Sequence, residues 1–149
     1  MRKVAIAVSL SACVATTGAQ AHVTIWPRES TAGGFEKYTV RAPTEGKIAT
    51  TEVELGVADG ATIVAIGVPL AWKYETRREG DRIVSVVWKM NIAPGEFAEF
   101  SFMARNPATP GKAIWRLRQR FADGTASDFT EGPKGIYASA TVSLTSSKP

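Results

Sequence analysis

Hydrophobic and polar positions alternate along most of the chain after residue 21, in short runs separated by Gly and Pro. Tyr38 and Val40, for example, interleave with Lys37, Thr39 and Arg41. A period of two is typical of half-buried β-strands, and we find no helical period. The strands that we predict span residues 23–26, 35–41, 50–57, 62–68, 72–77, 83–90, 96–105, 113–121, 127–130 and 137–144.

Turn signals such as Asp59-Gly60, Pro94-Gly95 and Asp123-Gly124 separate these runs. Their spacing of about eight to twelve residues predicts an all-β fold, either a sandwich or a barrel. Four aromatic residues lie in the strongest strand patterns, and we expect them in the core: Trp88, Trp115, Phe100 and Phe102.

The first 21 residues have a different character. A basic start is followed by an apolar run over 4–14 and by the small residues Ala19 and Ala21, which is typical of a secretory signal peptide cut after Ala21. No later apolar run is long enough to span a membrane. We therefore expect a periplasmic or extracellular protein with no membrane span in its mature form. The predicted organisation is a signal peptide at 1–21, one folded domain at 22–145 and a flexible tail at 146–149.

Charge gives little indication of a partner. The chain carries 18 basic and 14 acidic side chains, and loss of the leader removes two of the basic ones. This excess is too small to imply a nucleic-acid partner. The densest basic group, Arg116, Arg118 and Arg120, alternates with Leu117 and Gln119, as the solvent face of a strand does.

The only cysteine, Cys13, lies in the leader, so the mature domain has neither a disulfide nor a thiol metal ligand. The stretch Leu10-Ser11-Ala12-Cys13 also resembles a lipoprotein cleavage box. That alternative cut, before Cys13, would leave His22 nine residues inside the chain. The two cuts therefore have opposite consequences for His22.

His22 is the only histidine, and it is the first residue after the predicted cut behind Ala21. A first-position histidine offers its α-amino nitrogen and its ring Nδ1 on one residue, and the two can chelate a metal. With no thiol in the mature chain, the remaining donors are carboxylates, carbonyls, the Gln119 amide and water. A donor set of amine, imidazole and carboxylate suits Cu(II). Trp26, four residues further along the first strand, could line such a site.

Glu96 and Glu99 are the most notable carboxylates, because they lie in an aromatic-rich predicted strand. A buried carboxylate must be paired, hydrogen-bonded or bound to a metal. Regular pleating places Glu96 on the face of Phe100 and Phe102, and Glu99 on the opposite face. Periodicity thus favours Glu96 for an inward site, although either residue could be a solvated strand-edge glutamate.

Several segments together resemble the YcnI-like family of bacterial secreted copper-binding domains. They span nearly all of the mature domain in order: Ala21-His22-Val23-Thr24, Tyr38 through Glu45, Pro69-Leu70-Ala71-Trp72, Val87-Trp88, Pro94 through Phe100 and Trp115 through Gly124. The resemblance implies an immunoglobulin-like antiparallel β-sandwich. It also implies a Cu(II) site made by a mono-histidine brace, that is, the amino terminus and ring of the first residue, with a glutamate and a nearby tryptophan.

On this sequence the resemblance assigns the brace to His22 and the glutamate to Glu99, with Glu96 as the alternative. The family tryptophan aligns with Phe129, so this chain departs from the pattern there. The implied function is that of a copper chaperone or scavenger that passes copper ions to a membrane copper transporter or to another copper carrier.

Two other classes of function remain as alternatives. A copper oxidase akin to polysaccharide-cleaving monooxygenases would need a second histidine, which this chain lacks, so we expect no enzymatic activity. A metal-free immunoglobulin-like module for adhesion or assembly remains open, and it could be a lipoprotein anchored at Cys13. The mature amino terminus separates that alternative from the copper-binding hypothesis.

Overall fold

The computed structural model describes residues 22–68, 72–129 and 140–146. The predicted signal peptide and residues 147–149 of the predicted tail lie outside this part of the chain. No helix among the described residues is long and apolar enough to cross a membrane. The described strands are β1 (Thr24–Trp26), β2 (Glu29–Thr31), β3 (Phe35–Pro43), β4 (Thr50–Gly56), β5 (Thr62–Ile66), β6 (Lys73–Glu79), β7 (Arg82–Ile92), β8 (Phe97–Arg105), β9 (Gly111–Ile114), β10 (Arg116–Phe121), β11 (Ala126–Phe129) and β12 (Thr141–Thr145).

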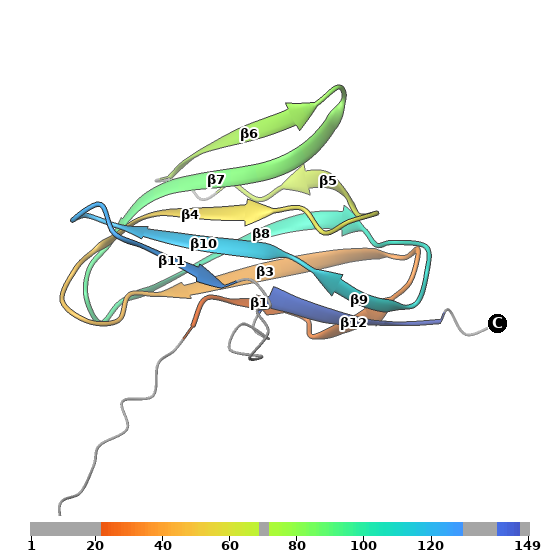
Figure 1. The fold of residues 1–149 in the computed structure, drawn as a ribbon, viewed down its shortest axis with the longest axis horizontal. Coiled ribbons are helices and arrows are strands. Elements are labelled where there is room, and N and C mark those ends of the chain that lie inside the picture. The colour runs from red at the N-terminus through yellow and green to blue at the C-terminus, as the bar shows by residue number, and fades with distance from the viewer. Residues whose placement is uncertain (1–21, 69–71, 130–139, 147–149) are drawn as a thin grey trace, which may run out of the picture.

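The strands form a sandwich of two main sheets, with a smaller third sheet beside them. One main sheet has the order β1-β3-β8-β5 and the other β11-β10-β4-β7-β6, while the third is β2-β12-β9. Figure 1 shows β10, β4 and β7 in one layer and β8 and β3 in the layer behind. Neighbouring strands within the two main sheets run antiparallel. The predicted all-β antiparallel sandwich is therefore confirmed.

Aromatic side chains fill the space between the main sheets. The rings of Trp88 and Phe100 lie 4.3 Å apart, and that of Trp115 lies 4.9 Å from Phe102 and 5.2 Å from Tyr38, measured between centroids. All five residues are at most 3% exposed. Burying a large apolar side chain stabilises a fold by about 1.5–3 kcal/mol, so this cluster fixes the strands that carry the surface residues. The predicted core positions are confirmed.

The single strand predicted over 113–121 is wrong, because the chain changes sheets within it. β9 ends at Ile114 and β10 begins at Arg116, with the fully buried Trp115 between them. The Trp115 backbone N–H donates a hydrogen bond to Ala140 O over 2.8 Å. Because β9 pairs with β12 whereas β10 pairs with β4 and β11, one alternating run serves two sheets.

Two other predicted strands, 127–130 and 137–144, extend into residues 130–139, which the structure does not describe. Thr130 and residues 137–139 lie outside the described residues, whereas 127–129 lie in β11 and 141–144 in β12. The sequence pattern gave no signal for β2, which is only three residues long.

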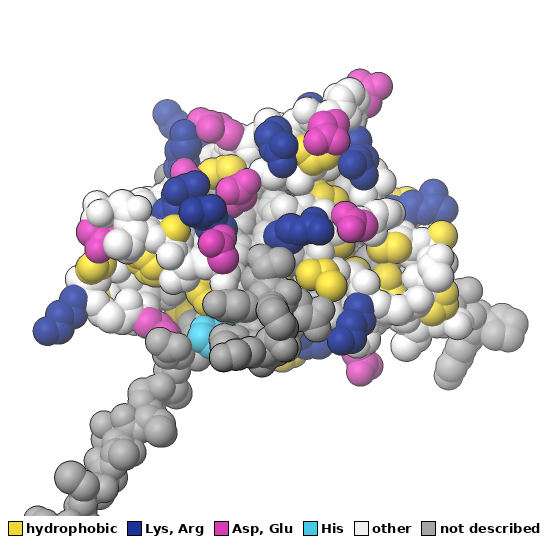
Figure 2. Space-filling view, viewed as in Figure 1, with side chains coloured by type: hydrophobic (Ala, Val, Ile, Leu, Met, Phe, Trp, Pro, Cys, Tyr) yellow, Lys and Arg dark blue, Asp and Glu magenta, His cyan; other side chains and the backbone are white. Residues whose placement is uncertain are grey.

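The outer face of the β11-β10-β4-β7-β6 sheet is charged, as the alternation of basic residues with Leu117 and Gln119 predicts. Leu117 and Gln119 point inward and are at most 3% exposed, whereas Arg116 is exposed. Arg120 Nε lies 2.8 Å from Glu52 Oε1 on the neighbouring strand. Figure 2 shows basic and acidic side chains interspersed over this face rather than gathered by sign. A face of this kind gives no support to a nucleic-acid partner.

Candidate metal centre

His22 lies at an edge of the sandwich, two residues before β1 begins at Thr24. Val23 and Ile25 are fully buried and hold this segment against the core, while the His22 side chain is half-buried. Figure 2 shows the one histidine of the chain, in cyan, at the molecular surface. β1 is the edge strand of its sheet and pairs with β3 alone within it. An ion in solvent can therefore reach the imidazole.

The aromatic neighbour of His22 is Phe129. The two ring centroids are 5.5 Å apart and the ring planes are tilted by 50°, which is within the usual range for an aromatic pair. Phe129 ends β11, the edge strand of the opposite sheet, and pairs with the buried Leu117. Phe129 itself is 7% exposed. The contact thus joins the edge strands of the two main sheets and restricts the orientations open to the His22 ring.

Glu99 lies on β8 and faces outward, as simple pleating predicts. Its Oε1 accepts a hydrogen bond from Arg41 Nε over 2.8 Å, and its side chain is 43% exposed. In the sheet Thr24 lies opposite Arg41, and Arg41 lies opposite Glu99. Two spacings of about 4.8 Å each therefore separate Thr24 from Glu99. The structure does not bring the Glu99 carboxylate into contact with His22.

Glu96 does not face inward, so the expectation from the pleat is wrong. β8 begins at Phe97, and Glu96 belongs to the turn before it, where Gly95 has a φ of 83°. Its Oε2 accepts a hydrogen bond from the Ala93 N–H over 2.9 Å, and the side chain is exposed. A carboxylate in a turn needs no burial, and this one stabilises the turn.

Trp26 does not line the position of His22. It lies four residues further along, which is roughly 13 Å in extended backbone. Its side chain is 46% exposed, and the Arg28 guanidinium carbon lies 4.9 Å from its ring centroid. Burial lowers the pKa of Arg28 below its usual value, yet arginine stays charged in proteins. Trp26 is therefore engaged with a cation of its own chain.

Gln119, the remaining candidate donor in the sequence, is used inside the fold. Its Nε2 donates hydrogen bonds to Pro43 O over 2.9 Å and to Thr50 Oγ1 over 2.6 Å. Continuing the β1–β3 register by two residues places His22 level with Pro43. Gln119 therefore fixes the end of β3 beside His22. This structural role had no signal in the sequence.

Among the described residues, no group of three or more His, Cys, Asp or Glu side chains is assembled to hold a metal. The structure brings together His22 and Phe129, and it leaves Glu99, Glu96 and Trp26 with other partners. Sequence reasoning missed Arg41, because its pairing with Glu99 depends on strand order. A metal at His22 would need the α-amino nitrogen and a carboxylate that leaves its present partner.

Comparisons with known proteins bear on this position. A family model described as "Domain of unknown function (DUF1775)" matches residues 22–143. A protein named "Copper-binding protein CutI", from Bacillus subtilis (strain 168), is 32% identical over 136 residues, which cover 89% of this chain and 67% of the relative. The family match begins at the only histidine.

Two solved structures are similar in fold. An uncharacterized protein from Nocardia farcinica, described as having an immunoglobulin-like fold, has a TM-score of 0.67 and 22% identity over 83% of this chain and 97% of its own. A type I cohesin from Pseudobacteroides cellulosolvens has a TM-score of 0.50 and 11% identity over 86% and 94% of the two chains. The sandwich is immunoglobulin-like, and these similarities show the fold alone.

Proposed function

Because the chain belongs to the DUF1775 family, we propose that it is a copper-binding protein whose site is built on His22. The YcnI-like resemblance inferred from the sequence is confirmed at the level of the family. The observation that carries the proposal is the start of the family match at the only histidine of the chain. A relative that is 32% identical is named a copper-binding protein.

The proposed site uses the chemistry that a first-position histidine supplies. Cleavage after Ala21 gives His22 an α-amino group, and this nitrogen and ring Nδ1 close a chelate around Cu(II). Cu(II) heads the affinity order of divalent first-row metals for such nitrogen donors. The half-buried position of His22 at the sheet edge supports access by the ion, and contact with Phe129 supports a fixed ring orientation.

We assign the carboxylate ligand to Glu99, with Glu96 as the alternative. Both lie on or beside β8, separated from β1 by β3. Glu99 is exposed and reaches the metal only by leaving Arg41, and Glu96 only by leaving the Ala93 N–H. A surface ion pair is worth about 0–1 kcal/mol, so the release of Glu99 from Arg41 costs little relative to metal coordination.

In this role the protein handles copper as cargo rather than as a catalytic cofactor. A site at the sheet edge with few protein ligands suits transfer, so the proposed function is that of a copper chaperone or scavenger without enzymatic activity. A membrane copper transporter or a second copper carrier is the proposed recipient. The proposed location is the periplasm or the extracellular space, which follows from a signal peptide at 1–21.

The proposal is tested by Cu(II) titration of the protein that begins at His22, beside the same protein with one alanine added before it. Both are read by electron paramagnetic resonance. Tight one-to-one binding should be lost on the alanine extension, because the extension moves the amine to another residue and leaves the rest unchanged. His22→Ala should abolish the same signal. Equal spectra and affinities for the original and extended proteins would show that the His22 α-amino nitrogen is not a copper ligand.

Two further measurements fix the remaining parts of the proposal. Glu99→Gln and Glu96→Gln each remove one carboxylate while keeping the side-chain shape, and we expect only Glu99→Gln to weaken binding and alter the spectrum. A loss confined to Glu96→Gln would move the ligand to Glu96.

Mass spectrometry of the exported protein should find His22 as the first residue. A lipidated start at Cys13 would contradict the proposed site.

A further inference from the structure

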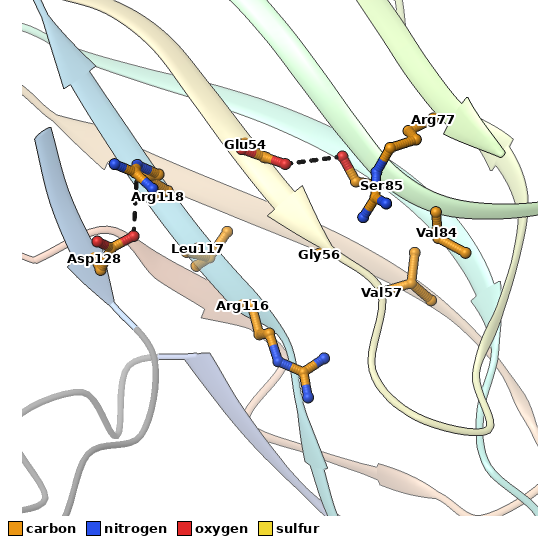
Figure 3. A pocket seen from close by; sticks show the side chains of 10 residues that line it. All are labelled: Glu54, Gly56, Val57, Arg77, Val84, Ser85, Arg116, Leu117, Arg118 and Asp128. Atoms are coloured by element: carbon orange, nitrogen blue, oxygen red, sulfur yellow. Dashed lines mark hydrogen bonds and ion pairs between the residues drawn. The ribbon is translucent and has the colours of Figure 1, made fainter. Parts of the chain in front are cut away.

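A second feature lies on the outer face of the β11-β10-β4-β7-β6 sheet, apart from His22. The cross-strand register places Arg116, Gly56, Ser85 and Arg77 in one row over β10, β4, β7 and β6. A groove of 270 Å³ lies over this row, and we refer to it below as the groove. In Figure 3 the Arg77 and Arg116 side chains lie on opposite sides of Gly56. The groove is thus bounded by two guanidinium groups.

Gly56 creates the space between these two arginines. It is the last residue of β4 and carries no side chain where its neighbours in the row do. A Cβ atom built on Gly56 would lie 3.1 Å from Arg116 Cβ, which is closer than ordinary van der Waals contact. Beside it Ser85 is only 2% exposed, and its Oγ donates a hydrogen bond to Glu54 Oε1 over 3.1 Å. Gly56 and the buried Ser85 therefore lie between the two arginines in the row.

The arginines of the groove are poorly paired compared with others on the same protein. Arg116 Nη1 lies 3.7 Å from Asp59 Oδ1, and Arg118 Nε lies 3.6 Å from Asp128 Oδ1. These are ion pairs without a hydrogen bond. Among the described residues Arg118 Nε is buried and has no hydrogen-bond partner. By contrast, Arg120 and Arg41 each donate a hydrogen bond of 2.8 Å to a carboxylate.

Arg77 has no ion pair at all with a described residue, and its guanidinium extends toward Ser85 in Figure 3. The groove therefore holds three guanidinium groups, from Arg77, Arg116 and Arg118, against two carboxylates, from Glu54 and Asp128. The lining residues alone carry a net positive charge, which the exposed Asp59 carboxylate beside Arg116 offsets from outside the lining. None of the three guanidinium groups donates a hydrogen bond to another residue of the part of the chain that the structure describes. Guanidinium forks match the paired oxygens of carboxylate and phosphate groups.

We propose that this groove binds a small oxyanion, held between Arg77 and Arg116 above Gly56. The shared chemistry of its ligands is a group in which two or more oxygens carry negative charge, and both phosphates and carboxylates provide it. The glycine admits the anion to the sheet surface, and the arginines close over it from either side. This inference does not depend on copper, so it is tested on metal-free protein.

The experiment is a titration of the metal-free protein with sodium phosphate, followed through the backbone amide shifts in ¹H–¹⁵N spectra. Sodium acetate forms the second arm and distinguishes a carboxylate ligand from a phosphate, and sodium chloride at equal ionic strength is the reference. We expect saturable shifts centred on the Gly56, Ser85 and Arg116 amides. Arg77→Gln and Arg116→Gln should each weaken the binding at least about tenfold, because a hydrogen bond between charged groups is lost.

Two control variants separate a built site from general attraction. Arg82→Gln removes the same charge from the same sheet, at an exposed residue paired with Glu79 outside the groove, and it should leave the titration unchanged. Gly56→Ala keeps every charge but fills the floor, and it should weaken binding while thermal melting shows the protein folded. Shifts that do not saturate, or that Arg82→Gln reduces as much as Arg77→Gln, would overturn the proposal. If Gly56→Ala fails to fold, the comparison of Arg77→Gln and Arg116→Gln with Arg82→Gln still distinguishes a built site from general attraction.

Discussion

Arg41 Nε donates a hydrogen bond to Glu99 Oε1 over 2.8 Å, joining residues 58 positions apart in the sequence. The Arg41 guanidinium carbon also lies 6.0 Å from the centroid of the Phe97 ring. Both members of the pair are about half exposed, so solvent screens their attraction. Arg41 is thus a competitor for the carboxylate that the proposed copper site requires.

Replacing Arg41 with glutamine should therefore raise the affinity for Cu(II). An exposed ion pair contributes about 0.2–1 kcal/mol, and its removal corresponds to a gain of up to about fivefold. Competition titrations of the original protein and of Arg41→Gln against a chelator of known affinity measure this difference. Lys89→Gln is the matched control, because Lys89 forms a similar exposed pair of 2.6 Å with Glu75 on the other sheet.

The double variant Arg41→Gln/Glu99→Gln separates competition from general electrostatics. Removal of any positive charge favours a nearby cation to some extent. If Arg41 acts by holding Glu99, the gain in affinity must vanish once Glu99 is glutamine. A gain of the double variant over Glu99→Gln that equals the gain of Arg41→Gln over the original protein would show that Arg41 acts through its charge and not by holding Glu99.

Phe129 should report directly on the metal, because its ring lies 5.5 Å from the ring of His22. Phe129→Trp introduces a tryptophan beside the proposed Cu(II), and a paramagnetic ion quenches tryptophan fluorescence at short range. We expect one equivalent of Cu(II) to remove more fluorescence from this variant than from the original protein. Phe35→Trp is the control, because Phe35 lies at the opposite end of β3 from Arg41 and Pro43. Equal extra quenching in both variants would contradict the proposed location.

The strands were predictable from sequence where one face is buried and the other solvated. In β3 the buried Tyr38 and Val40 alternate with solvated neighbours, and the alternation alone identifies the strand. Sheet order was not predictable, because pairing depends on contacts between distant residues. The change of sheet at Trp115 shows the same limit. Its burial continues the pattern of β10, while its backbone bonds elsewhere.

In the candidate site, too, some features could be predicted from the sequence and others depend on strand pairing. The position of His22 after a predicted cut is a property of the sequence, whereas the contact of its ring with Phe129 depends on how the two main sheets pack. The inward direction predicted for Glu96 failed because β8 begins one residue later, after a turn. The partnership of Glu99 with Arg41 needed the pairing of β3 with β8. The metal-binding roles of His22 and Glu99 stay predictions.

Asn106 should be important for stability rather than for metal binding. It is 3% exposed, accepts a hydrogen bond of 2.7 Å from the Tyr38 hydroxyl and donates bonds of 2.9 Å to Ser30 Oγ and Thr31 O. Asn106→Ala removes the acceptor of the buried Tyr38 hydroxyl and the donor to the partly buried Ser30 Oγ and Thr31 O, and we expect the free energy of unfolding to fall by about 3 kcal/mol. Urea denaturation measures it. Asn91→Ala, the same change at an exposed residue, should cost less than about 0.5 kcal/mol.

A fall of less than about 1 kcal/mol for Asn106→Ala would mean that water replaces the amide at little cost. Copper affinity serves as the second readout of this variant. It should be unchanged, because none of the partners of Asn106 lies beside His22. A parallel loss of affinity would instead show that the network positions the site.

Tyr38 should make stability fall at alkaline pH. Burial raises the pKa of its phenol above the usual value. In the unfolded chain a tyrosine loses its proton near pH 10, whereas the folded protein keeps this proton to higher pH. The unfolded state then binds fewer protons, so the free energy of unfolding falls as pH rises above about 10, and below that pH the group contributes no slope.

Urea denaturation at intervals from pH 8 to pH 11 measures this effect against Tyr38→Phe. The variant is less stable at pH 8, because it leaves the Asn106 amide oxygen without its donor, but it has no phenol to ionise at position 38. We therefore expect the difference in stability between the two proteins to shrink above about pH 10. Tyr74→Phe removes an exposed phenol and should keep the steep alkaline fall of the original protein. A constant difference between the original protein and Tyr38→Phe across this range would show that the buried phenol ionises equally in the folded and unfolded chains.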